Sequence, residues 1–181
     1  MKDRRAALLR GINVGRAKRV AMADLRAAVE GLGYQDVRTL LNSGNVVFTV
    51  PGKAKGDPGP RIEEAIATGL GVSSRVTVIT AAELAAAIDD NPLHEATAEP
   101  SRFLVAFLNN PADRTRLASI AQQDWAPEAF AIGTRVAYLW CPAGQLESPL
   151  GEAVNRELRD AATTRNWATV IKLQALIEDQ A

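Results

Sequence analysis

The spacing of apolar residues along the first half of the chain predicts alternating strands and helices. Apolar side chains recur every three or four residues over 22–32 and 62–70, which predicts two amphipathic helices. Short apolar or β-branched runs predict strands, and these runs lie at 6–9, 37–41, 46–50 and 75–79. Turn formers at 42–45 join the second and third runs as a hairpin. The order strand, helix, strand, strand, helix, strand is that of a ferredoxin-like unit.

The second half of the chain repeats this order. Its predicted strands lie at 102–108, 130–132 and 135–140. Its predicted helices lie at 111–121, with Pro111 at the first helical position, and at 150–158. Val136, for example, takes the place that Val46 has in the first half. Where a last strand would complete the repeat, apolar residues recur at steps of three. This predicts a C-terminal helix over 166–177, with a strand over 168–173 as the alternative.

These patterns predict an α+β fold of two tandem ferredoxin-like halves of the βαββαβ type. The repeat indicates a duplication, and we expect the halves to form one compact unit, with the second ending in a helix. Residues 91–101 contain two prolines and no basic residue, which is typical of an exposed connection. We therefore expect 1–90, including a linking helix, to form the first half and 91–181 the second.

Composition restricts the chemistry that the chain can perform. The 181 residues include a single cysteine, Cys141, and a single histidine, His94, which excludes an intramolecular disulfide and any multi-histidine or His-Cys zinc site. Cys141 is expected to be a small buried hydrophobe and His94 a solvated linker residue. We expect no metal and no cofactor. The N-terminus does not resemble a secretory signal and no apolar run would span a membrane, so we expect a cytoplasmic protein with no membrane partner.

Charge is unevenly distributed, although 21 basic residues balance 21 acidic ones. The first 19 residues carry seven Lys and Arg against Asp3 alone, a local charge of +6. Residues 81–101 carry a net charge of −5. Nucleic-acid affinity comes mainly from basic side chains that neutralise phosphates, so a dedicated nucleic-acid binder needs an extended basic surface. This charge distribution argues against such a surface. It leaves a basic N-terminal segment as a local site for an anionic partner.

Two polar loops form the main candidate site. In a ferredoxin-like sheet the first and second strands are parallel, so the loop after strand one emerges beside the hairpin between strands two and three. The residues that this arrangement brings together are Arg10, Asn13, Gly15, Ser43, Gly44 and Asn45. They offer a guanidinium, side-chain amides, a hydroxyl and backbone N–H groups, which suit a carboxylate, a phosphate or another planar polar ligand. The same residue types also satisfy turn backbones, which is the alternative interpretation.

Two further observations bear on this site. The spacing Gly11-x-Asn13-x-Gly15 matches neither the dinucleotide fingerprint nor a Walker A loop, which disfavours nucleotide binding of either standard kind. Arg165, Asn166 and Trp167 form a second candidate, which would complete the site if this segment folds against the first-half loops. In the alternative interpretation Thr164 or Asn166 caps a helix, Trp167 packs in the core and Arg165 is solvated.

Five segments resemble a known family. They lie at 8–15, 22–26, 41–48, 163–167 and 169–173, with the sequences LLRGINVG, MADLR, LNSGNVVF, TTRNW and TVIKL. In these segments the chain resembles the bacterial family catalogued as domain of unknown function 1697. The resemblance implies a cytoplasmic bacterial α+β protein with a duplicated ferredoxin-like organisation, and it implies no reaction. The chain departs from the family at Arg16-Ala17, where members often have a second glycine and a polar residue.

The preferred function is the binding of a small anionic or polar ligand at the edge formed by the first-half loops. One alternative is nucleic-acid binding through the basic N-terminal segment. RNA stacking would require the aromatic residues of the second half, which at their spacing more often face a core; these are Phe103, Phe107, Tyr138 and Trp140. The other alternative is a cofactor-free enzyme that uses the same polar loops. The ligand, any reaction and the oligomeric state stay open.

Overall fold

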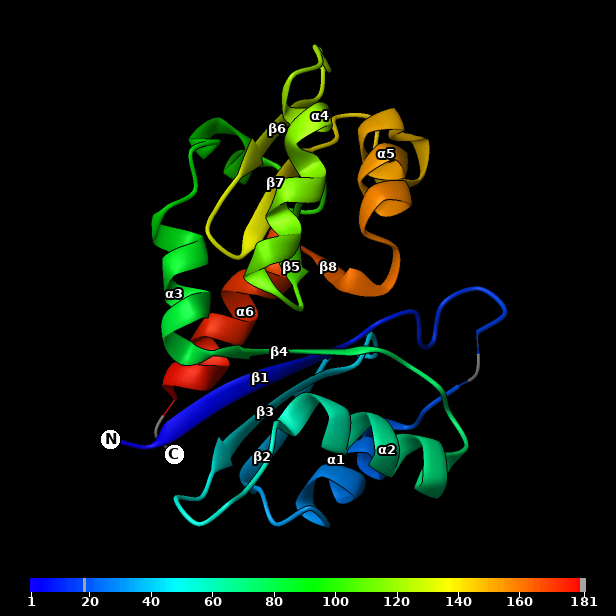
Figure 1. Cartoon of the computed structure of the whole chain (residues 1–181), viewed down its shortest axis with the longest axis vertical. Coiled ribbons are helices and arrows are strands. Elements are labelled where there is room, and N and C mark those ends of the chain that lie inside the picture. The colour runs from blue at the N-terminus through cyan, green and yellow to red at the C-terminus, as the bar shows by residue number, and fades with distance from the viewer. Residues whose placement is uncertain (18, 180–181) are drawn as a thin grey trace. The chain divides into compact units, whose positions relative to one another are not determined.

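The structure, a computed structural model, describes residues 1–17 and 19–179 (Figure 1). Within them the chain has a mixed α+β fold with two four-stranded antiparallel sheets and six α-helices. It divides into two compact units: Met1–Ala82 with the C-terminal segment from Lys172, and Glu83–Ile171. The predicted α+β class is confirmed. The ferredoxin-like organisation and the predicted halves 1–90 and 91–181 stay predictions.

The first unit is built on a sheet of strand order β2-β3-β1-β4 (Figure 1). Its strands are β1 (Asp3–Leu9), β2 (Gln35–Leu40), β3 (Asn45–Val50) and β4 (Val76–Thr80). Leu8 pairs with Asn45 and Leu9 with Val76, so the end of β1 lies beside the start of both neighbouring strands. This register places three connecting segments at one edge of the sheet.

Two helices cover one face of this sheet, α1 (Met22–Glu30) and α2 (Pro58–Leu70) (Figure 1). Because side chains alternate across a strand, Ala7 and Leu9 join this core while Ala6 and Leu8 point to the other face. The helices contribute buried side chains at helical spacing, namely Leu25, Val29, Ile62 and Ile66. Full burial of an aliphatic side chain of this size stabilises the fold by roughly 1.5–3 kcal/mol.

The ends of α2 show how the local sequence determines an element. Asp57 precedes the helix and its Oδ1 accepts a hydrogen bond from the Gly59 N–H at 3.1 Å. Pro58 occupies the first helical position, where its missing N–H costs nothing. Gly71 ends the helix in a left-handed conformation with φ 63°. The end of this helix at Gly71 was predicted from the sequence, whereas its start at Pro58 lies four residues ahead of the predicted apolar pattern, which begins at Ile62.

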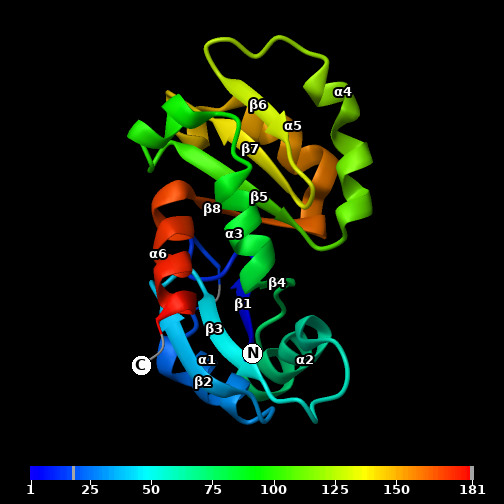
Figure 2. The same cartoon turned by 90° about the vertical axis from the view of Figure 1, so that its left-hand side faces the viewer.

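The second unit repeats the strand order in its own sheet, β6-β7-β5-β8 (Figure 2). Its strands are β5 (Phe103–Leu108), β6 (Ala129–Ile132), β7 (Val136–Trp140) and β8 (Ala162–Asn166). Its helices are α4 (Ala118–Ala121), α5 (Pro149–Leu158), all but the first two residues of α3 (Ala81–Asp89) and the first five residues of α6 (Trp167–Glu178). Helices α4 and α5 pack with a 3₁₀ turn at Pro111–Leu117 on one sheet face, and a second 3₁₀ turn lies at His94–Ala98.

The opposite face of the second sheet carries the aromatic residues of β5 and β7. Phe103, Phe107 and Tyr138 are at most 1% exposed. The Tyr138 hydroxyl donates to the Ala87 carbonyl of α3 at 2.6 Å, and the Trp167 ring lies 5.1 Å from that of Phe103. These three rings of β5 and β7 therefore belong to a core, as the sequence analysis favoured, and they are not available for stacking on RNA.

The C-terminal region corrects one prediction. A final strand does complete the second sheet, but it lies at β8, ahead of the helix. The helix α6 (Trp167–Glu178) follows directly, so the predicted C-terminal helix is confirmed and the alternative strand over 168–173 is wrong. The segment Ala162-Thr163-Thr164-Arg165-Asn166 pairs with all but the first residue of β5 although it contains no large apolar side chain. This strand is held by backbone pairing to a buried partner strand, and the spacing of apolar residues does not reveal a strand of that kind.

Candidate functional site

Three segments of the first unit meet at the end of β1. The Leu9 N–H donates to the Gly44 carbonyl at 2.9 Å, which joins β1 to the β2-β3 turn. The Arg10 N–H donates to the Arg75 carbonyl at 2.9 Å, and the Ser74 hydroxyl donates to the Arg10 carbonyl at 2.8 Å. We call this region the loop edge; it comprises residues 10–17, 19, 20, 41–45 and 72–75. The predicted meeting of the first loop with the hairpin is observed, and the third segment is an addition that sequence reasoning missed.

Asn13 connects two of these segments. Its Nδ2 donates to the Asn42 carbonyl at 2.7 Å and to the Val20 carbonyl at 2.9 Å. Its Oδ1 accepts from the Val20 N–H at 2.7 Å, and its carbonyl accepts from Nη1 of Arg19 at 2.7 Å. The Asn13 side chain therefore positions the loop, which is the turn-forming role that the sequence analysis gave as the alternative.

The backbone of the first loop alternates in handedness. Gly11, Asn13 and Gly15 have φ values of 68°, 53° and 52°, whereas Ile12 and Val14 between them keep negative φ. Loops whose residues alternate between right-handed and left-handed conformation can turn successive N–H groups toward one side and bind an anion, and the positive φ values at every second residue here are compatible with that pattern. The positive φ falls on Gly15 and not on the residues that follow it, so the family's second glycine is not required here.

The hairpin turn is held tightly against the first loop. Asn45 is fully buried, and its Nδ2 donates to the Leu40 carbonyl at 2.8 Å and to Oγ of Ser43 at 2.9 Å. Gly44 has φ 85°, and a Cβ added there would lie 2.7 Å from Cδ1 of Ile12. Asn45 and Gly44 therefore set the shape of the turn, and whether the predicted hairpin residues contact a ligand stays a prediction.

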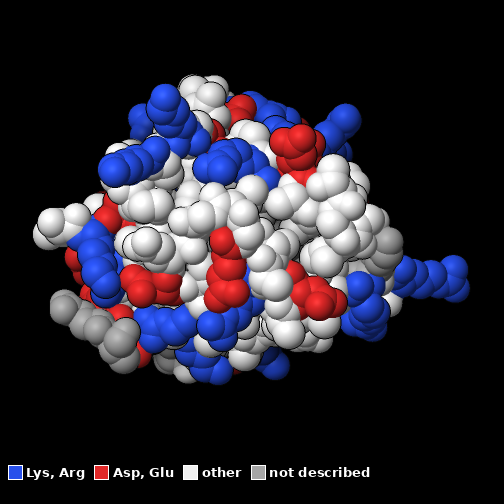
Figure 3. All heavy atoms as spheres, turned by 90° about the horizontal axis from the view of Figure 1, so that it is seen from below, with Lys and Arg blue, Asp and Glu red and all other residues white. Residues whose placement is uncertain are grey.

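Arginines surround the loop edge. Arg16, Arg19 and Arg75 are exposed and Arg10 is half-buried, while Lys18 lies outside the described residues. Nη1 of Arg75 lies 3.5 Å from Oε2 of Glu63. Arg19 is held against the first loop by its hydrogen bond to the Asn13 carbonyl. The surface seen from below mixes basic and acidic side chains (Figure 3). The loop edge therefore offers several guanidinium groups to an anion.

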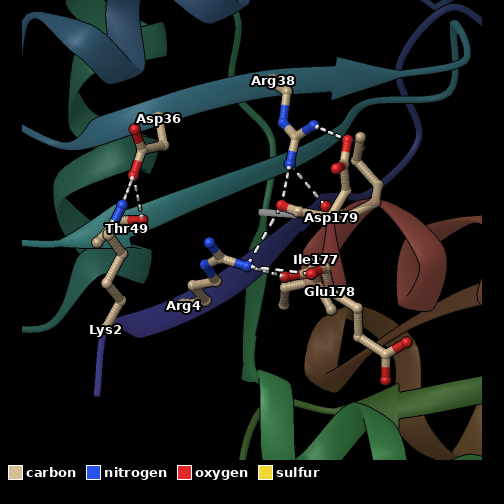
Figure 4. A network of polar contacts seen from close by, with 9 residues as sticks. Lys2, Arg4, Asp36, Arg38, Thr49, Ile177, Glu178 and Asp179 are labelled. Carbon is tan, nitrogen blue, oxygen red and sulfur yellow. Dashed lines mark hydrogen bonds and ion pairs between the residues drawn. The ribbon is translucent and has the colours of Figure 1, made fainter. Parts of the chain in front are cut away.

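The remaining basic residues of the N-terminal segment lie at the other end of β1. Nζ of Lys2 is 3.2 Å from Oδ2 of Asp36 (Figure 4). Nη2 of Arg5 is 2.9 Å from Oδ2 of Asp3. The pKa of the Asp36 carboxyl is lowered, first by a hydrogen bond from Thr49 and then by Lys2. Since β1 is seven residues long and rises about 3.3 Å per residue, roughly 20 Å separates these charges from the loop edge. The local charge of +6 is therefore not one patch.

At that end of β1, Arg4 binds the C-terminal end of α6. Its Nη1 donates to the Ile177 carbonyl at 2.8 Å and to the Asp179 carbonyl at 3.3 Å (Figure 4). Arg38 joins it from β2, with Nη2 bonded to the Leu176 carbonyl at 2.8 Å and Nη1 to Oδ2 of Asp179 at 2.8 Å. Both guanidiniums satisfy carbonyls at the C-terminal end of α6, where the helix dipole is negative.

The second candidate segment belongs to the other unit and has structural tasks there. Oδ1 of Asn166 accepts from the Thr169 N–H at 2.9 Å and so caps α6, as the alternative interpretation held. Trp167 is 8% exposed and packs on Phe103. Arg165 is half-buried, and burial lowers the pKa of its guanidinium to about 10, so it is not the solvated side chain of the alternative interpretation. That the segment shares a site with the loop edge stays a prediction.

The other reactive side chains are placed as expected. Cys141 is fully buried, and burial raises the pKa of its thiol, which makes it a poor nucleophile. His94 is exposed in the 3₁₀ turn at His94–Ala98. Among the residues that the structure describes, no group of three His, Cys, Asp or Glu side chains could hold a metal ion.

Comparisons with known proteins agree with the fold. The model of a family described as "Protein of unknown function (DUF1697)" matches residues 2–138. Conserved bacterial protein SP0830 from Streptococcus pneumoniae is similar over 98% of this chain and 100% of that chain, with a TM-score of 0.79 at 21% identity. At this identity the likeness shows the fold alone. No curated protein matches the chain. In the described part of the chain, every helix is too short or too polar to cross a membrane.

Proposed function

Because this chain belongs to the family described as protein of unknown function DUF1697, which brings no activity with it, we propose a function from the loop edge: the protein binds a small anionic ligand there. The ligand carries a phosphate or carboxylate group. Arg10, Arg16 and Arg19 supply the positive charge, and the backbone of the first loop supplies N–H donors. Arg165 to Trp167 are kept as candidate ligand contacts.

One observation supports this proposal above all: the first loop has left-handed residues at 11, 13 and 15, and arginines lie around it. This backbone pattern is compatible with an anion-binding concavity. The hydrogen bonds of Asn13 hold this shape before any ligand arrives, so little conformational entropy is lost on binding. Guanidinium groups add charge-assisted, bidentate contacts to a carboxylate or phosphate.

The test is a binding titration with inorganic phosphate, citrate and a panel of phosphorylated and carboxylated metabolites. A ligand at about one hundred times its Kd stabilises the native state by about 2.7 kcal/mol, which raises the Tm by several degrees. We expect Arg16→Gln and Arg19→Gln each to weaken binding about tenfold, as loss of a charge-assisted hydrogen bond predicts. Arg26→Gln on α1 is the matched control, because it removes an exposed arginine of the same unit that pairs with Glu30.

Two results would contradict the proposal. One is the absence of any anion-dependent shift in Tm at millimolar ligand. The other is equal loss of affinity in Arg16→Gln, Arg19→Gln and Arg26→Gln, which would show a general effect of charge and not a site.

The two other functions considered receive less support. Nucleic-acid binding through the N-terminal segment is disfavoured because its charges are divided between the two ends of β1. A cofactor-free enzyme would use the same loop edge, but the Asn13 and Asn45 side chains are engaged in holding loops. Activity screening of any ligand found by titration would identify such an enzyme.

We also propose that the two units are duplicated ferredoxin-like βαββαβ modules and that the protein is bacterial and cytoplasmic. The matching strand orders β2-β3-β1-β4 and β6-β7-β5-β8 support the duplication. The sequence resemblance supports the source and location. Cell fractionation with an antibody against the protein would test the location, and recovery in a membrane or secreted fraction would contradict it.

A further inference from the structure

Two apolar side chains are exposed at the loop edge. Val14 is 56% exposed and Leu41 is 48% exposed. Val14 follows Asn13 in the chain, and Leu41 precedes Asn42. Nδ2 of Asn13 donates a hydrogen bond to the Asn42 carbonyl at 2.7 Å. The two apolar residues are therefore held on neighbouring segments, beside the left-handed loop and its arginines.

The backbone at Leu41 is strained. Its φ is 56°, a left-handed value that a bulky side chain rarely adopts and that glycine or asparagine adopts readily. Strained residues of this kind persist where the surrounding structure holds them, and they cluster at active and ligand-binding sites. The usual compensation is burial, but about half of the Leu41 side chain is left in water. Burial inside the chain therefore does not fully account for a leucine at this place.

We infer that the ligand of the loop edge is amphiphilic: a small soluble anion with a short alkyl or acyl group that covers Val14 and Leu41. This inference rests on the proposed function, because the anionic group takes the arginines and the left-handed loop. The apolar group then removes the two side chains from water, which adds affinity through burial. The chemical class includes alkyl phosphates and short-chain acyl carboxylates.

A soluble molecule suits this surface better than a membrane does. Interfacial anchors use a long amphipathic helix with a broad apolar face. Here the apolar contribution is two side chains, Val14 and Leu41. The carboxylate of Glu63, which lies 3.5 Å from Nη1 of Arg75 at the loop edge, would be repelled by an anionic bilayer.

The test compares inorganic phosphate with butyl and hexyl phosphate by isothermal titration on the full chain. Burial of a methylene strengthens binding about two- to fourfold, so hexyl phosphate should bind at least about tenfold more tightly than inorganic phosphate. Leu41→Asn and Val14→Ser should each lower the ratio of the hexyl phosphate affinity to the inorganic phosphate affinity, because each removes apolar surface and no arginine. Leu146→Ser, which alters a leucine that is 99% exposed in the other unit, is the matched control and should change neither.

A stability measurement separates this role from a structural one. Leu41→Asn should leave the Tm unchanged or raise it, because asparagine tolerates the left-handed backbone. A lower Tm would assign Leu41 to the fold and overturn the inference.

The outcomes of the titration distinguish the two proposals. If inorganic phosphate binds and the alkyl chain adds nothing, the amphiphilic ligand is overturned while anion binding stands. If no phosphate binds, the proposed function fails as well. Binding to anionic phosphatidylglycerol vesicles that Leu41→Asn abolishes, without a gain for hexyl phosphate, would assign the pair to a lipid surface and overturn the soluble ligand.

Discussion

Single residues at the loop edge act through backbone shape as much as through their side-chain chemistry. Asn13 and Asn45 were predicted as ligand contacts from their amide groups, and the structure shows those amides bonded to neighbouring loops. Sequence reasoning correctly placed the first loop beside the hairpin. It could not assign the hydrogen-bond partners, because these depend on which carbonyls lie within about 3 Å once the segments have met.

Glycines of the loop edge provide a residue-scale prediction. Gly15 has φ 52° with open space around an added Cβ, so Gly15→Ala should lower the free energy of unfolding by about 1–2 kcal/mol through backbone strain alone. Gly44→Ala should cost roughly 1–3 kcal/mol more, because its Cβ would lie 2.7 Å from Cδ1 of Ile12. Urea unfolding of both variants checks the difference. Equal losses would contradict the close packing of the hairpin turn on the first loop.

At the scale of elements, the end of α6 is held by arginines from two strands. Arg4 and Arg38 bond carbonyls at Leu176, Ile177 and Asp179. Arg38 follows a register shift in β2, where Asp36 has φ 52°. The sequence shows only two arginines far from the C-terminus, and the sheet order brings them to it.

Removal of either arginine should loosen the last turn of α6. Hydrogen bonds from a charged donor contribute about 1.5–3 kcal/mol, so Arg4→Ala and Arg38→Ala should each lower the free energy of unfolding by about that amount. Because both bond the Asp179 carbonyl, their effects should not add fully. Hydrogen exchange should accelerate for the amides of the last turn. Losses no larger than in the control Arg26→Ala would show that these bonds contribute nothing.

The contact between α3 and β7 predicts a dependence on alkaline pH. Burial raises the pKa of the Tyr138 phenol to about 12, with a smaller contribution from Asp90. A pKa raised above the unfolded value of about 10 gives stability that is complete below pH 10 and is lost as pH rises toward 12. Tyr138→Phe should therefore cost about 1 kcal/mol at pH 7, from the bond to Ala87, and lose less stability than wild type between pH 10 and 12. Parallel curves for the two proteins in that range would contradict it.

At the scale of the whole molecule, charge separates the candidate functions. The chain is neutral, with 21 basic and 21 acidic residues. Its most basic segment is divided along β1, where Lys2 pairs with Asp36 and Arg5 with Asp3, and Arg38 of β2 pairs with Asp179. The described residues of this segment therefore present no continuous basic track to a nucleic acid.

We therefore expect no appreciable binding of a labelled twenty-nucleotide RNA or DNA, even at low ionic strength. Fluorescence anisotropy over a salt series is the measurement, because phosphate contacts make affinity fall steeply with salt. Micromolar binding at low salt would support the nucleic-acid alternative, if a plot of log affinity against log salt concentration gave a slope equivalent to several phosphate contacts.

The sequence by itself determined the α+β class, most of the strands and helices, and the edge at which the first loop meets the hairpin. These follow from local periodicity, helix caps and turn residues, which act over a few neighbouring positions. Tertiary structure decided the existence of β8, the third segment at the loop edge, the anchoring of α6 by Arg4 and Arg38, and the exposure of Leu41. Each of these depends on contacts between residues far apart in the chain, and such contacts leave no period in the sequence.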